Sequence, residues 1–385
     1  MFRGVFATAA VAVVLTAVPA SADEPVAPVD LGTLPGGLTS YGDLVSNDGT
    51  VFGMAFDKAN NPRGARWDAA GRITELPPQP GYTSVVPAAI TEDGVALGNS
   101  MSAIESAGRA TLWGASGVPV DLPPVPGYPS SSVAAINAHG IAAGYSYGAS
   151  ATDTAVKWDT TRGTVTALGS GRGFAINDAG AVLGSYQGES KYWDPAGNLV
   201  PLEGGGTPAD LGNAGTVVGS SGSHAAKWDA AGHLTVLDTT WKFSTAEEIG
   251  ADGTIYGTVE AGDGTRHLAR WDPAGPLTMH PNPDGVWTRF VTANDTGSAL
   301  VEIGSGKYFV WGSGGGLTAL RPLTENAWCG ADDLNDLVHG HRLGQTDESE
   351  ARSRTEGRDD GQSHEAGSKM HCSFPSDPSW VGPLG

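Results

Sequence analysis

The chain has 385 residues; 57 are Gly, 25 are Pro and 17% are charged, while 39% are hydrophobic and 11 are Trp. Abundant Gly and Pro can mean disorder, but this apolar and aromatic content is enough to bury a core, so the composition indicates many short strands and turns. The formal net charge of −20 repels phosphate backbones and anionic membranes, which excludes nucleic acid as an expected partner.

The N-terminus has the pattern of a secretory signal. Arg3 precedes an apolar stretch from Val5 to Val18 that is too short for a good membrane span, and Ala20-Ser21-Ala22 then forms an A-x-A cleavage site. We therefore interpret residues 1–22 as a signal peptide and expect a secreted, extracellular protein. No later stretch approaches a spanning length, so the protein is not expected to span a membrane.

A tryptophan recurs every 35 to 46 residues through most of the chain. The series consists of Trp67, Trp113, Trp158, Trp193, Trp228, Trp271 and Trp311. Five of its members are followed by Asp. A period of this length marks a repeat architecture, in which each unit becomes stable by stacking on its neighbours.

Each unit carries a second signature upstream of its tryptophan. An apolar residue, an Asn/Asp turn, a Gly and an apolar run ending in Gly follow one another, as in the segment Ile176–Gly184. The copy near residues 294–297 lacks the closing Gly. The unit divides into four strands, and Asp194-Pro195-Ala196-Gly197 has the residues of a tight turn between the third and the fourth.

Four antiparallel strands in about 35 to 46 residues make one blade of a propeller. The sequence therefore predicts an all-β fold, a β-propeller of four-stranded antiparallel blades, with seven blades favoured and eight as the alternative. We interpret the repeated tryptophans as structural core that fills the space between blades, not as a binding stripe.

The two ends of the repeat region indicate how the ring closes. The segment Val29–Leu34 resembles an isolated fourth strand, and an eighth copy begins at Ala327 and stops matching after Gly340. We expect a repeat domain over residues 28–340, closed by pairing the two ends in one blade, and a tail over 341–385 that is disordered or the product of an altered reading frame. Whether Cys329 and Cys372 form a disulfide is left open.

The units resemble the bacterial extracellular HAF-repeat family in the order of three motifs. The start is Leu31-Gly32-Thr33-Leu34-Pro35-Gly36-Gly37, the centre is the segment Ile176–Gly184, and the end is His224-Ala225-Ala226-Lys227-Trp228. The His-Ala-Phe triplet of that family is never intact here. The resemblance implies secretion and a repeat fold, and it supplies no catalytic residues.

The search for chemistry yields no catalytic set. Gly144-Tyr145-Ser146-Tyr147-Gly148 matches G-x-S-x-G, but it lies at the end of a predicted second strand and not at a strand-to-helix turn. The Asn/Asp-Gly turns offer too few oxygen ligands for calcium, and the nine histidines show no paired ligand spacing. We expect no catalytic residues, no metal and no cofactor.

One face of the propeller is expected to carry the function. The loops between second and third strands vary in length and share a face with the connections from the fourth strand to the next unit. Four tyrosines on this face are the candidate ligand-binding residues, and packing of the blade junctions is the alternative role for them. They are Tyr82, Tyr128, Tyr145 and Tyr147.

Two classes of function follow from these features. The first is a secreted, non-catalytic binding or interaction module whose ligand is an unknown extracellular polysaccharide or surface protein. The alternative is an extracellular propeller enzyme, a lyase or hydrolase that uses the central funnel, because propellers host both classes. We favour the binding module and expect a monomer.

Overall fold

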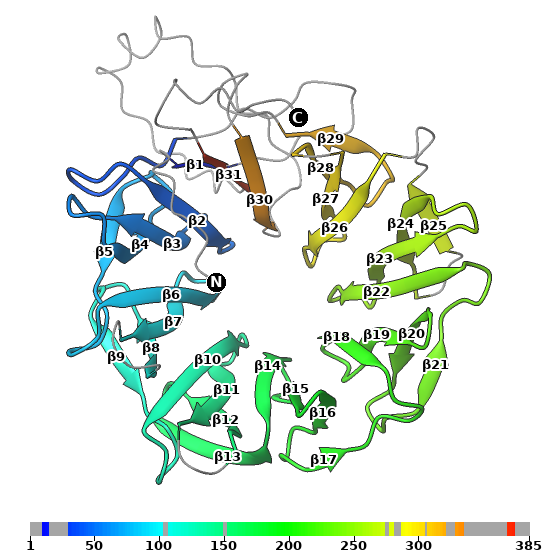
Figure 1. Ribbon diagram of the computed structural model, residues 1–385, viewed down its shortest axis with the longest axis horizontal. Coiled ribbons are helices and arrows are strands. Elements are labelled where there is room, and N and C mark those ends of the chain that lie inside the picture. The colour runs from blue at the N-terminus through cyan, green and yellow to red at the C-terminus, as the bar shows by residue number, and fades with distance from the viewer. Residues whose placement is uncertain are drawn as a thin grey trace, which may run out of the picture.

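The computed structural model describes residues 30–102, 107–148, 152–273, 277–280, 286–304 and 306–320, together with three strands outside these ranges. Twenty-eight strands in the described residues form seven four-stranded antiparallel sheets, each in sequence order, and the sheets follow one another around a ring (Figure 1). This arrangement confirms the predicted fold class and the favoured number of blades.

The strands have the following bounds. Blade 1 is β2 (Ser40–Val45), β3 (Val51–Phe56), β4 (Pro62–Trp67) and β5 (Ile73–Leu76); blade 2 is β6 (Ser84–Ile90), β7 (Ala96–Met101), β8 (Gly108–Trp113) and β9 (Pro119–Leu122); blade 3 is β10 (Ser130–Ile136), β11 (Ile141–Tyr147), β12 (Thr154–Asp159) and β13 (Thr164–Ser170); blade 4 is β14 (Arg172–Ile176), β15 (Val182–Tyr186), β16 (Glu189–Trp193) and β17 (Leu199–Val200). Blade 5 is β18 (Thr207–Leu211), β19 (Val217–Ser221), β20 (His224–Trp228) and β21 (Leu234–Val236); blade 6 is β22 (Phe243–Ile249), β23 (Ile255–Glu260), β24 (Arg266–Trp271) and β25 (Leu277–His280); blade 7 is β26 (Thr288–Ala293), β27 (Ala299–Ile303), β28 (Tyr308–Trp311) and β29 (Leu317–Ala319).

A three-stranded sheet lies in the ring between blade 7 and blade 1 (Figure 1). It contains β1 (Ala10–Val14), β31 (Ser368–Ser373) and β30 (Trp328–Leu334), in that order. The strands β1 and β31 fall within the segments predicted to be a signal peptide and a tail, and both of those interpretations stay predictions. The register of β30 against β31 places the backbone of Cys329 opposite that of Cys372, and their pairing also stays open.

Residues 30–34 differ from the expected fourth strand. They form no strand; Gly32 and Gly36 have positive φ, and the N–H of Gly37 donates to the carbonyl of Leu34 at 2.8 Å. Leu31 and Leu34 are nevertheless buried and pack in the same cluster as Trp67. The sheet at this point of the ring consists of β30, β31 and β1, and residues 30–34 pair with none of these strands. The two leucines therefore cover the first blade without joining a sheet.

All seven tryptophans of the repeat are buried, and most contribute to clusters that join two blades. Trp113 of blade 2, for example, packs with Phe52 and Leu76 of blade 1. Its indole N–H also donates to the carbonyl of Pro77, which follows the last strand of blade 1, at 2.8 Å. The corresponding bonds run from Trp158 to Pro123 and from Trp228 to Glu203. In these three units the tryptophan thus joins neighbouring blades by packing and by a hydrogen bond.

The closing Gly of the repeat has a steric cause. In the first strand of every complete blade, the register shifts near its middle, so this strand bulges toward the second. A Cβ at Gly144 would meet the carbonyl oxygen of Ser132 in the facing strand, and one at Gly257 would meet that of Thr245. Blade 7 has the same register shift with Val301 opposite Phe290, so in this one blade a side chain stands where the others have Gly.

Within the described residues, the structure contains no helix with the length and apolar character needed to span a bilayer.

Candidate functional site

A pocket of about 420 Å³ opens where blades 5, 6 and 7 meet. It is lined by the beginnings of β18, β22, β24 and β26 and by the ends of β19 and β23. These are the ends of the strands that face the loops between second and third strands and the connections between blades. The pocket therefore lies on the face that the sequence predicted to be functional.

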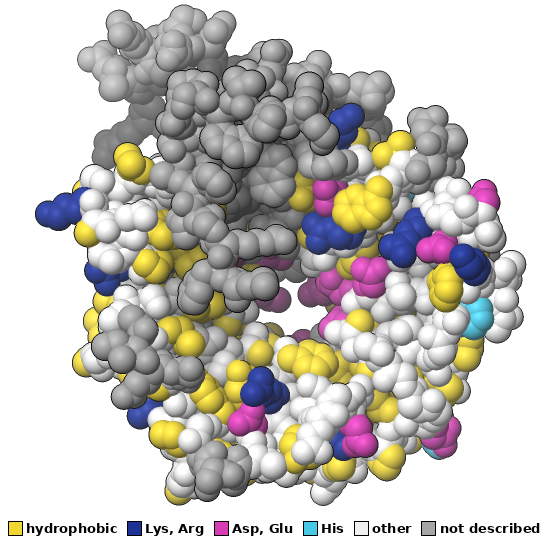
Figure 2. Space-filling view, viewed as in Figure 1, with side chains coloured by type: hydrophobic (Ala, Val, Ile, Leu, Met, Phe, Trp, Pro, Cys, Tyr) yellow, Lys and Arg dark blue, Asp and Glu magenta, His cyan; other side chains and the backbone are white. Residues whose placement is uncertain are grey.

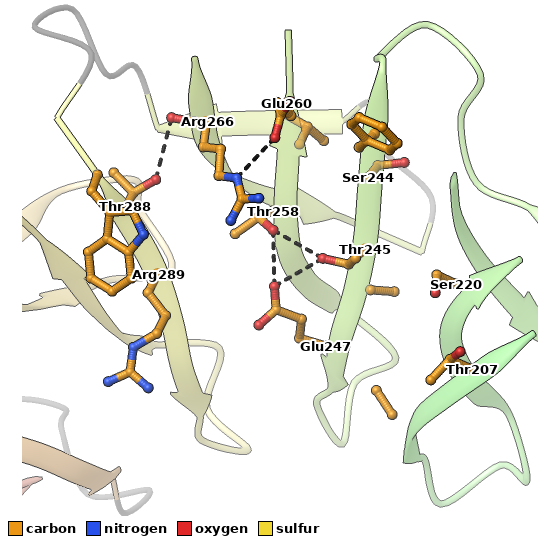
Figure 3. Close-up of a pocket in the computed structure, with 15 residues that line it drawn as sticks. Thr207, Ser220, Ser244, Thr245, Glu247, Thr258, Glu260, Arg266, Thr288 and Arg289 are labelled. Carbon is orange, nitrogen blue, oxygen red and sulfur yellow. Dashed lines mark hydrogen bonds and ion pairs between the residues drawn. The ribbon is translucent and has the colours of Figure 1, made fainter. Parts of the chain in front are cut away.

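The inner part of the pocket is a triangle of two hydroxyls and one carboxylate. Thr245 of β22 and Thr258 of β23 are cross-strand partners whose hydroxyl oxygens lie 3.0 Å apart. Each hydroxyl also donates to Oε1 of Glu247 at 3.1 Å. Figure 3 shows the three side chains pointing toward one another, with Arg289 on one side of them and Thr207 and Ser220 on the other.

Glu247 reaches the pocket because it is the extra residue of the bulge in β22. The register passes from Ala246 directly to Glu248, so Glu247 has no cross-strand partner of its own. Burial raises the pKa of its carboxyl, while the threonine hydroxyls and the nearby Arg289 and Arg266 partly oppose this shift. Among the described residues, no hydrogen bond to its second oxygen, Oε2, is present.

The other charged groups of the pocket are ion-paired. Arg266 and Glu260 are cross-strand partners with Nε and Oε2 3.1 Å apart, and Lys242 adds a contact of 3.4 Å to Glu260. The hydrogen bond from Arg266 holds the pKa of Glu260 below its usual value. Arg289 is paired in the same way with Glu302, at 3.2 Å. Each arginine is thus fixed by a carboxylate from the adjacent strand.

Two large aromatic side chains remain exposed at the pocket. Trp287 is 49% exposed and Phe243 is 45% exposed. Trp287 directly precedes β26 and Phe243 begins β22, and each of these is the innermost strand of its blade. The backbone of Trp287 is fixed, because its carbonyl accepts a hydrogen bond of 2.7 Å from the N–H of Gly304. Figure 2 shows hydrophobic, basic and acidic side chains gathered on this face over blades 6 and 7. Exposed aromatic rings beside fixed polar groups are typical of ligand sites.

A second group of carboxylates lies at the axis. Oδ2 of Asp210 accepts from the N–H of Ile249 in the next blade at 3.0 Å, and Oδ2 of Asp333 in β30 accepts from Val45 of blade 1 at 2.8 Å. Glu248 occupies the corresponding position of blade 6. Burial, followed by the charge of Asp210, raises the pKa of Glu248 to about 8. These carboxylates accept hydrogen bonds from the neighbouring blade and so link the blades. Figure 2 shows acidic side chains at the central opening.

The structure brings three of the four predicted tyrosines together. The rings of Tyr145 and Tyr147 are 5.4 Å apart, and Tyr82 is near enough for its charge to help raise the pKa of Tyr147, after burial and Tyr145. The guanidinium of Arg172 lies 4.7 Å from the centre of the Tyr145 ring. Tyr128 is separate: its hydroxyl bonds to the carbonyl of Thr152 and the hydroxyl of Thr154. A role for these tyrosines in ligand binding stays a prediction.

The serine of the G-x-S-x-G match is part of the core. Ser146 lies within β11, is fully buried, and accepts a hydrogen bond of 3.1 Å from the N–H of Val125. It therefore does not stand on a strand-to-helix turn. In the described part of the chain, no group of three His, Cys, Asp or Glu side chains is placed to hold a metal ion.

Sequence reasoning missed the pocket residues Glu247, Arg266, Trp287 and Arg289. Glu247 depends on a bulge and the arginines on cross-strand register, neither of which a single sequence displays. One signal was present: Trp287 is among the few tryptophans outside the repeated series.

Comparison with known proteins finds similar solved structures at low identity. No family model and no curated protein matches the chain. The structure of streptogramin B lyase is 16% identical and matches over 77% of this chain and 86% of its own, with a TM-score of 0.42. The β-propeller domain of the trilobed protease from Pyrococcus furiosus is 12% identical over 74% and 97%, with a TM-score of 0.49. Puromycin hydrolase is 13% identical over 77% and 56%, with a TM-score of 0.46. Similarity at this level supports no statement about activity.

Proposed function

We propose that this chain is a secreted binding module that holds an extracellular ligand in the pocket between blades 5, 6 and 7. The observation that carries the proposal is the exposure of Trp287 and Phe243 beside side chains that are already fixed by hydrogen bonds and ion pairs. Such a site is organised before the ligand arrives, so little ordering of side chains opposes binding. Secretion follows from the signal-like N-terminus, and the protein acts as a monomer without nucleic acid.

The charges of the pocket favour binding over catalysis. Glu260 and both arginines are held in ion pairs, and Glu247 is held by two hydroxyls. These groups are therefore held in fixed positions. Fixed polar groups of this kind hold and orient a ligand, which is the task of a binding module.

Biolayer interferometry with the purified protein tests the proposal. Polysaccharide and protein fractions of a bacterial cell-surface preparation are immobilised separately, and we expect the wild type to bind one of them. Trp287→Ala should abolish that binding, whereas Phe174→Ala, which removes an exposed aromatic ring outside the pocket, should not. Equal binding by Trp287→Ala and the wild type, or no binding to either fraction, would overturn the proposal. Release of fragments from the bound material would favour the enzyme.

A further inference from the structure

We propose that the ligand of this pocket is a neutral saccharide chain, whose sugar ring lies against Trp287 and whose hydroxyls donate to Glu247. The inference rests on the proposed function and adds the chemical class of the ligand. It follows from the charges of the pocket, from its unused hydrogen-bonding groups and from its exposed aromatic surface.

The charges of the pocket oppose an ionic ligand. A polyanion would meet arginines whose charges Glu260 and Glu302 already balance, at 3.1 and 3.2 Å, and would approach a chain of net charge −20. A cation could pair with Glu247, but Arg266 and Arg289 lie close enough to affect the same carboxyl. A ligand without charge avoids the repulsion that an anion would meet and the repulsion that the two arginines would exert on a cation.

The unused hydrogen-bonding groups suit hydroxyls. Oε1 of Glu247 accepts from two threonine hydroxyls, which orients the carboxylate and leaves Oε2 for a ligand donor. Thr207 and Ser220 line the other flank of the pocket, and their hydroxyls can both donate and accept. The pocket therefore offers a fixed carboxylate as acceptor and hydroxyls that can either donate or accept. This set of hydrogen-bonding groups matches a ligand with many hydroxyls.

The exposed aromatic surface suits the remaining part of a sugar. A pyranose ring has an apolar C–H face and a rim of hydroxyls, so it needs an apolar surface and polar partners at its edge. Trp287 supplies such a surface on the β26 side, and Phe243 supplies a second one at the start of β22. The volume of about 420 Å³ is within the usual range of about 300–1,000 Å³ for small-ligand sites.

Isothermal titration calorimetry with defined probes tests the inference. The neutral probes are six-residue cello-, malto-, xylo-, manno- and laminari-oligosaccharides, with hexagalacturonate as the anionic probe and hexameric chitosan as the cationic one. We expect at least one neutral probe to bind and neither charged probe to bind. Trp287→Ala and Glu247→Ala should each weaken binding by about tenfold or more, while Phe174→Ala and Glu92→Gln should leave it unchanged.

Two further measurements separate direct contact from a folding defect. Thermal unfolding of each variant must match the wild type within the error of the control variants, and Glu247→Gln serves as a second variant if Glu247→Ala is unstable. Saturation-transfer NMR should place the C–H protons of one sugar face against the protein, and Trp287→Ala should remove that signal.

The outcomes distinguish this inference from the proposed function. Binding of a charged probe alone, or binding of a surface protein that depends on Trp287 while no neutral probe binds, overturns the saccharide and leaves the binding module intact. If neither the probes nor the cell-surface fractions show any binding that depends on Trp287, both the saccharide and the binding module are overturned.

Discussion

The side-chain amide of Asn137 donates a hydrogen bond of 2.9 Å to the backbone carbonyl of Asn177, 40 residues later in the chain. Asn177 repeats the contact with the carbonyl of Gly212 at 3.0 Å. Both asparagines are buried, and each also accepts a hydrogen bond from a backbone N–H of its own turn. The Asn of the repeat motif therefore shapes its turn and links its blade to the next.

The first prediction concerns this link. Asn177→Ala removes a buried acceptor from the N–H of Ala181 and a buried donor from the carbonyl of Gly212. We expect the free energy of unfolding to fall by about 2–4 kcal/mol, because each buried group left without a partner costs about 1–3 kcal/mol. Urea unfolding measures the change. Asn198→Ala, which loses only the exposed side-chain bond to Asp194, should cost much less, and an equal loss in both variants would contradict the prediction.

The second prediction compares two tryptophans of the repeat. The indole N–H of Trp113 donates to the carbonyl of Pro77, whereas that of Trp67 is buried and has no partner in the described residues. Both side chains are fully buried, so replacement by Phe leaves a similar cavity. We expect Trp113→Phe to lower the free energy of unfolding by about 1–3 kcal/mol more than Trp67→Phe. Denaturant unfolding of the pair measures this difference, and the reverse order would count against the hydrogen bond.

The third prediction concerns the closing Gly. In Gly144→Ala the new Cβ would meet the carbonyl oxygen of Ser132 and approach the Trp158 ring to 2.9 Å. We expect a loss of about 2–4 kcal/mol in the free energy of unfolding, because neither the bulged strand nor the buried ring can move freely. Gly114→Ala is the control, since a Cβ at Gly114 would have no other atom within 4 Å. Thermal melts in which both variants equal the wild type would disprove the steric explanation.

The fourth prediction concerns pH and the axis. Burial raises the pKa of Glu248 from 4.5 to about 8, so between these values the folded protein holds a proton that the unfolded chain has lost. Stability from this group is therefore complete below about pH 4.5 and is lost as the pH rises through about 8. Glu248→Gln keeps the site neutral, so we expect it to be more stable than the wild type at pH 8.5 and to differ little at pH 5.

Melting temperatures between pH 4.5 and 9 measure this effect as the difference between variant and wild type, which cancels the other titrating groups. Glu92→Gln, an exposed replacement of the same kind, should give a curve parallel to the wild type. A constant difference between Glu248→Gln and the wild type over the whole range would show that Glu248 does not titrate there.

The sequence by itself determined the repeat, the strand order within each unit and the ring of blades. Hairpin turns and alternating burial are local, so their residues stand close together in the chain, as Asp194 and Gly197 do in the turn where the Gly197 N–H donates to the Asp194 carbonyl at 2.8 Å. The recurring tryptophan likewise marked each unit, because every unit carries its own copy within a short stretch of the chain. Closure was harder, because it joins segments from opposite ends of the chain, and residues 30–34 covered a blade instead of forming a strand.

Only the tertiary structure decided where the pocket lies. Its groups come from three blades, and their positions depend on a bulge at Glu247, on cross-strand pairing of Arg266 and Arg289, and on a Trp287 that the repeat does not require. Contacts between residues tens of positions apart are set by how sheets pack against one another. The spacing of residues along a single chain records the repeat period, but it does not record which side chains from neighbouring blades face the same space.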